Sequence, residues 1–236
     1  MKRPFTVCHM LTSLDGKIDG AWMRAEGTAG SLKTFGEARG FYKCKATLYG
    51  TTTALGSYSD GRVENLTQAV QNYPYDDYIA DTDVENYIVN LDPKGILKYS
   101  DKYLARKGRP KAHVIEVLTK AVSPDYIAYL RRLDISYIFA GDEVFDCALM
   151  LDKLYNLFGI DRLMISGGGY TNWSFVKDRL VDEISLVIAP VADGNTTSLS
   201  IFEKSDFMGD IPPVNFGLID VQKTEGGGLW LRYNVK

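Results

Sequence analysis

Three consecutive glycines, Gly167–Gly169, separate an apolar run at 161–166 from a stretch with helical spacing at 170–180. Backbone amides at the N-terminus of a helix bind anions, and glycines leave those amides open to a group such as a pyrophosphate. The string is not the Gly-x-Gly-x-x-Gly fingerprint of a Rossmann unit, and for the string alone a plain glycine-rich turn is a nearly equal alternative. The candidate anion-binding residues here are Ser166, Gly167, Gly168, Gly169 and Tyr170.

A second group of reactive side chains follows the apolar run FTVCHML at 5–11. Thr12, Asp15 and Lys17 offer a hydroxyl, a carboxylate and an amine within six positions. Gly16 allows a sharp turn among them. Such groups can bind the hydroxyl, amino and phosphate groups of a substrate. An Asp-Gly turn whose polar groups satisfy only the backbone is the alternative, and it is the simpler one for this segment alone.

Two further polar groups also follow apolar runs. Gly50, Thr51 and Thr53 come directly after the run ATLY, and their amides and hydroxyls suit phosphate or ribose oxygens. Lys94 follows the run NYIVNL and offers a cation that could meet a ribose 2′-phosphate. Threonine runs are also common in turns and caps, and an exposed turn lysine is the alternative for Lys94.

Alternating strands and helices are needed to position these groups. The expected strands are 5–11, 46–49, 86–91, 112–118, 135–140, 161–166 and 181–191, and the expected helices are 31–45, 123–134, 144–159 and 170–180. This alternation predicts an α/β fold of one domain over 1–236, with a mostly parallel sheet flanked by helices. Since ligands collect at the carboxyl ends of parallel strands, all four polar groups are expected at one edge of the sheet.

Local signals predict several boundaries and the C-terminal end. The pair Ser123–Pro124 predicts a helix N-cap followed by a proline at the first helical position, and Gly159 predicts the end of a helix. The segments 216–223 and 229–236 alternate apolar and polar residues around a glycine-rich turn, which predicts an antiparallel hairpin. The polar, turn-rich stretch 56–85 is expected to pass over the ligand-bearing end of the sheet.

The composition argues against several classes of function. A formal net charge of -3, a pI near 5.5 and scattered basic residues do not suit a nucleic-acid surface. His9, His113 and three distant cysteines form no metal-ligand pattern, so no metal is expected. The N-terminus lacks the apolar segment of a signal peptide, and no run approaches membrane-spanning length. We therefore expect a cytoplasmic protein that binds neither membranes nor nucleic acid.

Two motifs resemble the reductase domain of riboflavin biosynthesis, a RibD C-terminal-like family with the dihydrofolate-reductase fold. SLDGKI at 13–18 is similar to the first motif of that family, and GGGYTNWSFVKDRLVDEISLVIAPVADG at 167–194 is similar to its longest motif. The order and spacing of the two motifs also match. The resemblance implies an NADPH-dependent reductase that acts on a ribosylated, phosphorylated aminopyrimidine and opens its ribose to a ribityl chain. It also implies a homodimer.

The resemblance implies roles for the candidate residues. Asp15 and Lys17 would face the substrate and the nicotinamide. Gly167, Gly168 and Gly169 would bind the cofactor pyrophosphate, and Gly50, Thr51 and Thr53 its phosphate and ribose region. Apart from the resemblance, the further expected cofactor contacts are Thr12, Lys94, Ser166 and Tyr170. Hydride would pass from nicotinamide C4 to the imine-type carbon of the sugar, and the protein would contribute mostly positioning.

Departures from the family pattern leave alternatives open. Ser166 stands where the family usually has an acidic residue, and the segments 19–45 and 56–85 match poorly. A reductase of dihydrofolate, a pterin or another heterocycle is one alternative, and a dinucleotide-binding protein without turnover is another. The sequence has no room for the deaminase domain often fused upstream, so we expect a stand-alone reductase.

Overall fold

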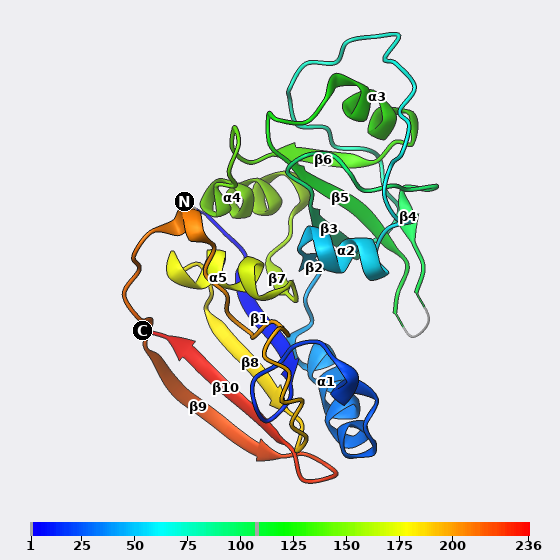
Figure 1. The fold of residues 1–236 in the computed structure, drawn as a ribbon. Helices are drawn as coiled ribbons and strands as arrows, with labels where there is room; N and C mark the ends of the chain where they lie inside the picture. The colour runs from blue at the N-terminus through cyan, green and yellow to red at the C-terminus, as the bar shows by residue number, and fades with distance from the viewer. Residues whose placement is uncertain (1, 107–108) are drawn as a thin grey trace. The chain divides into compact units, whose positions relative to one another are not determined.

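A computed structural model of the chain describes residues 2–106 and 109–236, which form two compact units of strands and helices (Figure 1). Unit 1 comprises Met1–Pro4 and Lys45–Asp161, and unit 2 comprises Phe5–Cys44 and Arg162–Lys236. Each unit is therefore assembled from segments that are distant in the sequence. The expectation of a single domain stays a prediction.

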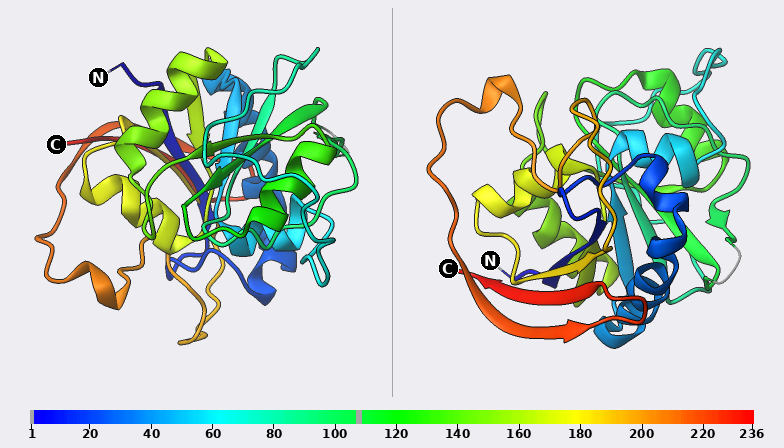
Figure 2. Two further views of the ribbon diagram at one scale, coloured as in Figure 1. Left: turned by 90° about the horizontal axis from the view of Figure 1, so that it is seen from above. Right: turned by 60° about the horizontal axis from the view of Figure 1, so that its bottom comes forward.

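Unit 2 is built on a central strand with parallel neighbours on both sides. Its strands are β1 (Phe5–Thr12), β7 (Arg162–Ile165), β8 (Glu183–Ile188), β9 (Phe216–Lys223) and β10 (Leu229–Val235). β1 pairs in parallel with β7 and β8, and β10 pairs antiparallel with β8 and β9. The side chains of 6–12 are all buried, which explains why β1 is a continuous apolar run and not an alternating one. Figure 2 shows the predicted β9–β10 hairpin in orange and red.

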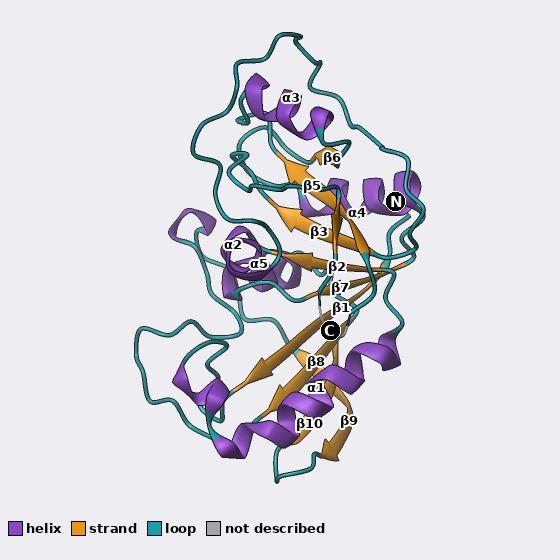
Figure 3. Ribbon diagram, turned by 90° about the vertical axis from the view of Figure 1, so that its right-hand side faces the viewer, coloured by secondary structure: helices purple, strands orange, loops and turns teal. Residues whose placement is uncertain are grey.

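The helices of unit 2 include α1 (Ala29–Tyr42), which packs on β1 and β8 (Figure 3), and α5 (Gly169–Lys177). The short helices η1 (Ala21–Arg24), η2 (Glu26–Thr28) and η3 (Asp206–Met208) complete the unit. The ring of His9 on β1 stacks on Phe35 of α1 with centroids 4.3 Å apart. Its Nε2 lies 2.9 Å from the Phe35 carbonyl oxygen and its Nδ1 lies 2.9 Å from Ser185 Oγ. Because a carbonyl only accepts, Nε2 carries the proton and ties α1 to the strands.

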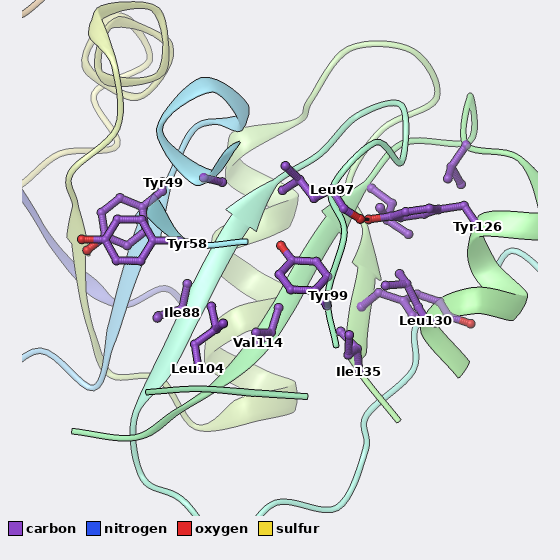
Figure 4. Packing of buried hydrophobic residues seen from close by; sticks show 14 of the residues in the cluster. Tyr49, Tyr58, Ile88, Leu97, Tyr99, Leu104, Val114, Tyr126, Leu130 and Ile135 are labelled. Atoms are coloured by element: carbon purple, nitrogen blue, oxygen red, sulfur yellow. Dashed lines mark hydrogen bonds between the residues drawn. The ribbon is translucent and has the colours of Figure 1, made fainter. Parts of the chain in front are cut away.

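Unit 1 has a second set of mostly parallel strands. These are β2 (Ala46–Tyr49), β3 (Tyr87–Leu91), β5 (Ala112–Leu118) and β6 (Ser136–Phe139), paired in that order, with β4 (Tyr103–Leu104) antiparallel to the start of β5. The helices are α2 (Thr51–Ser57), α3 (Pro124–Arg132) and α4 (Cys147–Phe158). Figure 4 shows the core, in which the rings of Tyr49 and Tyr58 stack 3.7 Å apart. The α/β fold class, with mostly parallel strands, flanking helices and an antiparallel C-terminal hairpin, is confirmed.

The predicted helix boundaries in unit 1 follow their capping signals. Ser123 Oγ accepts a hydrogen bond from Tyr126 N at 3.2 Å, and Pro124 is the first residue of α3. Gly159 closes α4 in the left-handed conformation, with φ of 59°. α2 is not among the predicted helices, because its threonines have low helix propensity. The helix forms where Ala54 is fully buried in the core, so packing overrides propensity there.

The polar stretch expected over the ligand-bearing end lies against β6 and α3 within unit 1. Tyr78 forms an isolated antiparallel bridge with Tyr137 of β6. The Arg131 guanidinium of α3 sits 3.7 Å from the centroid of the Tyr78 ring. Asp77 accepts from Lys153 Nζ at 2.9 Å and from Phe139 N at 2.8 Å. Beyond Ser57, the last residue of α2, this segment contains no helix and is held by these specific contacts.

We predict that unit 1 loses stability in mild acid because of His113. This buried side chain has Ser136 Oγ at 2.7 Å from Nε2, and burial lowers its pKa to about 4. The unfolded chain, with a pKa of about 6.5, binds a proton that the folded chain does not. Stability is therefore lost as the pH falls from about 6.5 toward 4, by about 2 kcal/mol at pH 4.5.

Urea unfolding of the wild type and of His113→Gln at pH 7 and pH 4.5 measures this contribution. The variant is expected to lose less stability than the wild type between the two pH values. An equal loss in both proteins would show that His113 is not the group responsible.

Candidate functional site

In unit 2 the carboxyl ends of three parallel strands carry the predicted site segments. In the pairing register, Thr12 at the end of β1 lies opposite Ile188 at the end of β8. β7 ends earlier, with Ile165 opposite Cys8. The four residues by which β1 extends past this point correspond to about 13 Å at about 3.3 Å per residue. The loops 13–18 and 189–194 therefore begin at the same position along the strand direction. The glycine loop begins about four residues earlier along β1.

Asp15 is held between the loops that follow β1 and β8. Its Oδ1 accepts from Ser13 Oγ at 2.6 Å and from Asp193 N at 3.1 Å, and its Oδ2 accepts from Gly194 N at 2.8 Å. The Ser13 hydroxyl and then these two amides hold the pKa of the Asp15 carboxyl well below its ordinary value. The carboxylate is therefore ionised and fastens the two loops together. The predicted contact of Asp15 with a substrate stays a prediction.

Lys17 is positioned by the segment that follows β8. Its Nζ donates to the Ser198 carbonyl oxygen at 3.0 Å, and its backbone forms an antiparallel bridge with Ser200. Gly16 turns the chain between Asp15 and Lys17 with φ of +80°, a conformation that favours glycine. The ammonium group keeps two further protons with which to bind an anion or a hydroxyl.

The glycine loop begins with a serine that touches both β1 and α1. Ser166 Oγ donates to the His9 carbonyl oxygen at 3.2 Å and accepts from Arg39 Nη1 at 3.4 Å. A cationic side chain from α1 therefore stands beside Ser166, the position at which the family that the sequence resembles usually has an acidic residue. Arg39 is not among the predicted site residues, because nothing in the sequence near 39 connects it with the glycine motif.

Gly168 and Gly169 have different surroundings. A Cβ added at Gly168 would meet no heavy atom within 4 Å, and its φ of −65° and ψ of 171° suit any residue. A Cβ at Gly169 would lie 2.5 Å from the Ser200 carbonyl oxygen and 2.6 Å from Glu203 Cγ. The protein itself therefore requires a glycine at 169 but not at 168.

The start of α5 has the properties of an anion site. Gly168 occupies the N-cap position and no side chain caps the helix. The first amides of a helix have no acceptor within it, and the helix dipole favours a negative charge beside them. Tyr170, in the first turn, is exposed. The first amides of α5 are therefore not occupied by a capping side chain.

Unit 1 holds the remaining candidates at the ends of β2 and β3. Gly50 is the N-cap of α2, which also lacks a side-chain cap, and Thr51 Oγ1 donates to the Leu91 carbonyl oxygen at 2.5 Å. Thr53 is half-buried in the same helix. The hydroxyl of Thr51 thus anchors the start of α2 to the end of β3, which leaves the amides of this start for a ligand.

Lys94 lies in a turn that a buried carboxylate organises. Asp92 Oδ2 accepts from Ile96 N at 2.7 Å and from Leu97 N at 2.8 Å, while burial raises the pKa of the Asp92 carboxyl. Gly95 takes φ of +66° inside this turn. Lys94 itself is exposed, so its ammonium group is accessible to a ligand.

Two classes of feature are absent from the part of the chain that the structure describes. Within 2–106 and 109–236 there is no group of three or more His, Cys, Asp or Glu side chains placed to hold a metal ion. None of the helices in these residues has the length and apolar character needed to cross a membrane.

The sequence matches the family described as the RibD C-terminal domain over residues 4–227. It is 26% identical over 240 residues to a Methanothermobacter thermautotrophicus protein named 2,5-diamino-6-ribosylamino-4(3H)-pyrimidinone 5′-phosphate reductase, covering 99% of both chains. An Aquifex aeolicus protein of the same name is 37% identical over 84 residues, which make up 36% of this chain and 37% of that protein.

Solved structures show the same fold at low sequence identity. A pyrimidine reductase-like protein from Corynebacterium diphtheriae matches with a TM-score of 0.69 at 16% identity, covering 99% of this chain and 92% of that one. Acinetobacter baumannii RibD, form 2, matches with a TM-score of 0.65 at 20% identity, covering 99% of this chain, which spans only 58% of its length. At these identities the similarity establishes the fold alone.

The two glycines provide a matched pair of substitutions. We expect Gly169→Ala to lower Tm by about 5–10 °C, because its Cβ would overlap backbone at Ser200. Gly168→Ala is expected to leave Tm within about 2 °C of the wild type, because the site is open and its backbone conformation suits alanine. Thermal unfolding followed by circular dichroism measures both. Equal losses would contradict the different surroundings described here.

Proposed function

Because the chain belongs to the family of the RibD C-terminal domain, we propose that it is an NADPH-dependent reductase of riboflavin biosynthesis. Its proposed substrate is an aminopyrimidine that carries a ribosylamino 5′-phosphate, the class named for the full-length Methanothermobacter relative. The observation that carries the proposal is the uncapped and open start of α5 at Gly168, directly after a parallel strand.

We propose that the residues present bind a dinucleotide. The first amides of α5 and α2 are free of side-chain caps, and glycines stand at both N-cap positions. We assign the pyrophosphate to the α5 start of unit 2. In unit 1, Gly50, Thr51 and Thr53 stay candidates for a phosphate or ribose contact. When bound, the reduced nicotinamide supplies the hydride that the reaction needs. We assign Thr12, which is buried at the end of β1, to a contact with the nicotinamide.

The side chains of this protein have a positioning role in the proposed reaction. Lys17 is held at a fixed place by Ser198, so its remaining protons bind a substrate phosphate or hydroxyl. Asp15 keeps the loops after β1 and β8 together and thereby fixes the backbone from which Lys17 projects. Arg39, beside Ser166, adds a positive charge at the level of the glycine loop. Rate enhancement of this kind comes from orientation of the reactants.

We also propose that the protein works in the cytoplasm as a homodimer. β9 pairs only with β10 among the described strands, and Leu218, Ile219 and Val221 on it are exposed. An edge strand with apolar side chains on its surface is typical of a strand that another chain covers. Sedimentation equilibrium of the full chain measures the mass directly, and a monomer at micromolar concentration would refute the dimer.

The reductase proposal is tested by turnover and by one substitution. We expect NADPH oxidation with the ribosylaminopyrimidine 5′-phosphate and none with dihydrofolate. Gly168→Val is expected to raise the Kd for NADPH about tenfold or more, because its side chain would occupy the anion site while the open surroundings preserve folding. Quenching of Trp173 fluorescence reports binding. If only dihydrofolate is turned over, the proposed substrate is wrong. If NADPH binds but is not oxidised with any substrate, the protein is not a catalyst.

Lys94 provides a test of the preference for NADPH over NADH. We expect Lys94→Met to raise KM for NADPH about five- to tenfold and to leave KM for NADH unchanged, since only NADPH carries a 2′-phosphate. Lys98→Met is the matched control, because Lys98 is also exposed in the same segment. If the wild type uses both cofactors equally well, the assignment of Lys94 to the 2′-phosphate is wrong.

A further inference from the structure

Residues 198–203, here called the strap, connect two loops of unit 2. On one side, the Ser198 carbonyl oxygen accepts from Lys17 Nζ at 3.0 Å, and the Leu199 carbonyl oxygen accepts from Ile18 N at 3.1 Å. On the other side, Glu203 N donates to the Gly169 carbonyl oxygen at 3.1 Å. The strap thus spans the distance between the loop after β1 and the start of α5.

A second contact fixes the strap to α5 itself. The Asn172 side chain is fully buried, and its Nδ2 donates to the Ile201 carbonyl oxygen at 2.9 Å. The rings of Trp173 and Phe202 follow on the same side, with centroids 6.2 Å apart. The first turn of α5 is therefore held by the strap through both backbone and side chain.

The shape of the strap depends on Glu203. Its Oε1 accepts from Ser200 N at 2.7 Å and lies 2.8 Å from Ser200 Oγ, which closes the turn 200–203 on itself. The stem of Glu203 and the Ser200 carbonyl oxygen lie where a Cβ of residue 169 would be, at 2.6 and 2.5 Å. This turn is therefore fitted to the bare backbone of Gly169.

From these contacts we infer that Glu203 is a positioning residue for the nucleotide-binding start of α5. It closes the strap, and the closed strap fixes the Gly169 carbonyl and Asn172, between which lie the amides that face the anion. The inference rests on the proposed function insofar as it takes the ligand to be a dinucleotide phosphate. The same strap also accepts a hydrogen bond from Lys17 Nζ through the Ser198 carbonyl oxygen, outside the turn 200–203.

The test uses the full chain, with NADPH as the probe, and the variants Glu203→Ala, Glu203→Gln and Glu26→Ala. Glutamine keeps an acceptor oxygen for Ser200 N, whereas alanine removes it. Glu26 is an exposed glutamate elsewhere in unit 2 and serves as the matched control. We expect Glu203→Ala to raise the Kd for NADPH about tenfold. Glu203→Gln and Glu26→Ala are expected to bind like the wild type.

Amide hydrogen exchange in the absence of any ligand provides an independent readout. We expect exchange at 169–172 to be faster in Glu203→Ala than in the wild type and unchanged in Glu203→Gln. If Glu203→Ala does not fold, Ser200→Ala, which removes one contact with Oε1, is expected to show a smaller change in the same direction.

Two outcomes would overturn the role of Glu203. One is that Glu203→Ala shows the same Kd for NADPH and the same amide exchange as the wild type. If Glu203→Ala does not fold, the same result for Ser200→Ala has this meaning. The other is a loss of affinity in Glu203→Gln as large as in Glu203→Ala, because charge and not the turn would then matter. A wild-type protein that binds no NADPH refutes the proposed function instead, and hydrogen exchange still decides whether Glu203 holds the start of α5.

Discussion

The feature on which the candidate site of unit 2 depends is the parallel pairing of β1 with β7 on one side and β8 on the other. β1 pairs with β7 over Phe5–Cys8 and with β8 over Val7–Thr12, and the side chains of 6–12 are buried as well. Because all three strands point the same way, the polar segments that follow them leave from one edge. The apolar character of 5–11 therefore determines where Asp15, Lys17 and the glycines are found.

Because these strands differ in length, the loops that follow β1 and β7 begin far apart, and the strap connects them. β7 ends opposite Cys8, whereas β1 continues to Thr12, so the glycine loop and the Lys17 loop leave about 13 Å apart along the strand direction. The chain after β8 returns across this interval and bonds to both loops. The ionised Asp15 carboxylate fixes the beginning of this segment by accepting hydrogen bonds from Asp193 N and Gly194 N.

Much of the fold follows from short-range sequence signals, whereas the contacts of the site do not. Ser123 and Gly159 mark helix ends because capping is a local interaction, and the hairpin follows from alternation around glycines. α2 departs from propensity because the burial of Ala54 comes from residues distant in sequence. The strap could not be predicted, since Glu203 and Gly169 meet only after β8 has paired with β1.

Adjacent glycines of the motif Gly167–Gly169 are present for different physical reasons. Gly169 is required by the fold, because the Ser200 carbonyl occupies the space of its side chain. Gly168 is not, since its backbone angles and surroundings accept other residues. Under the proposed function, a glycine at this uncapped helix N-terminus leaves the backbone amides open to an anion. The proposed binding role of the motif therefore lies at Gly168, whereas Gly169 makes room for the strap that contacts this backbone.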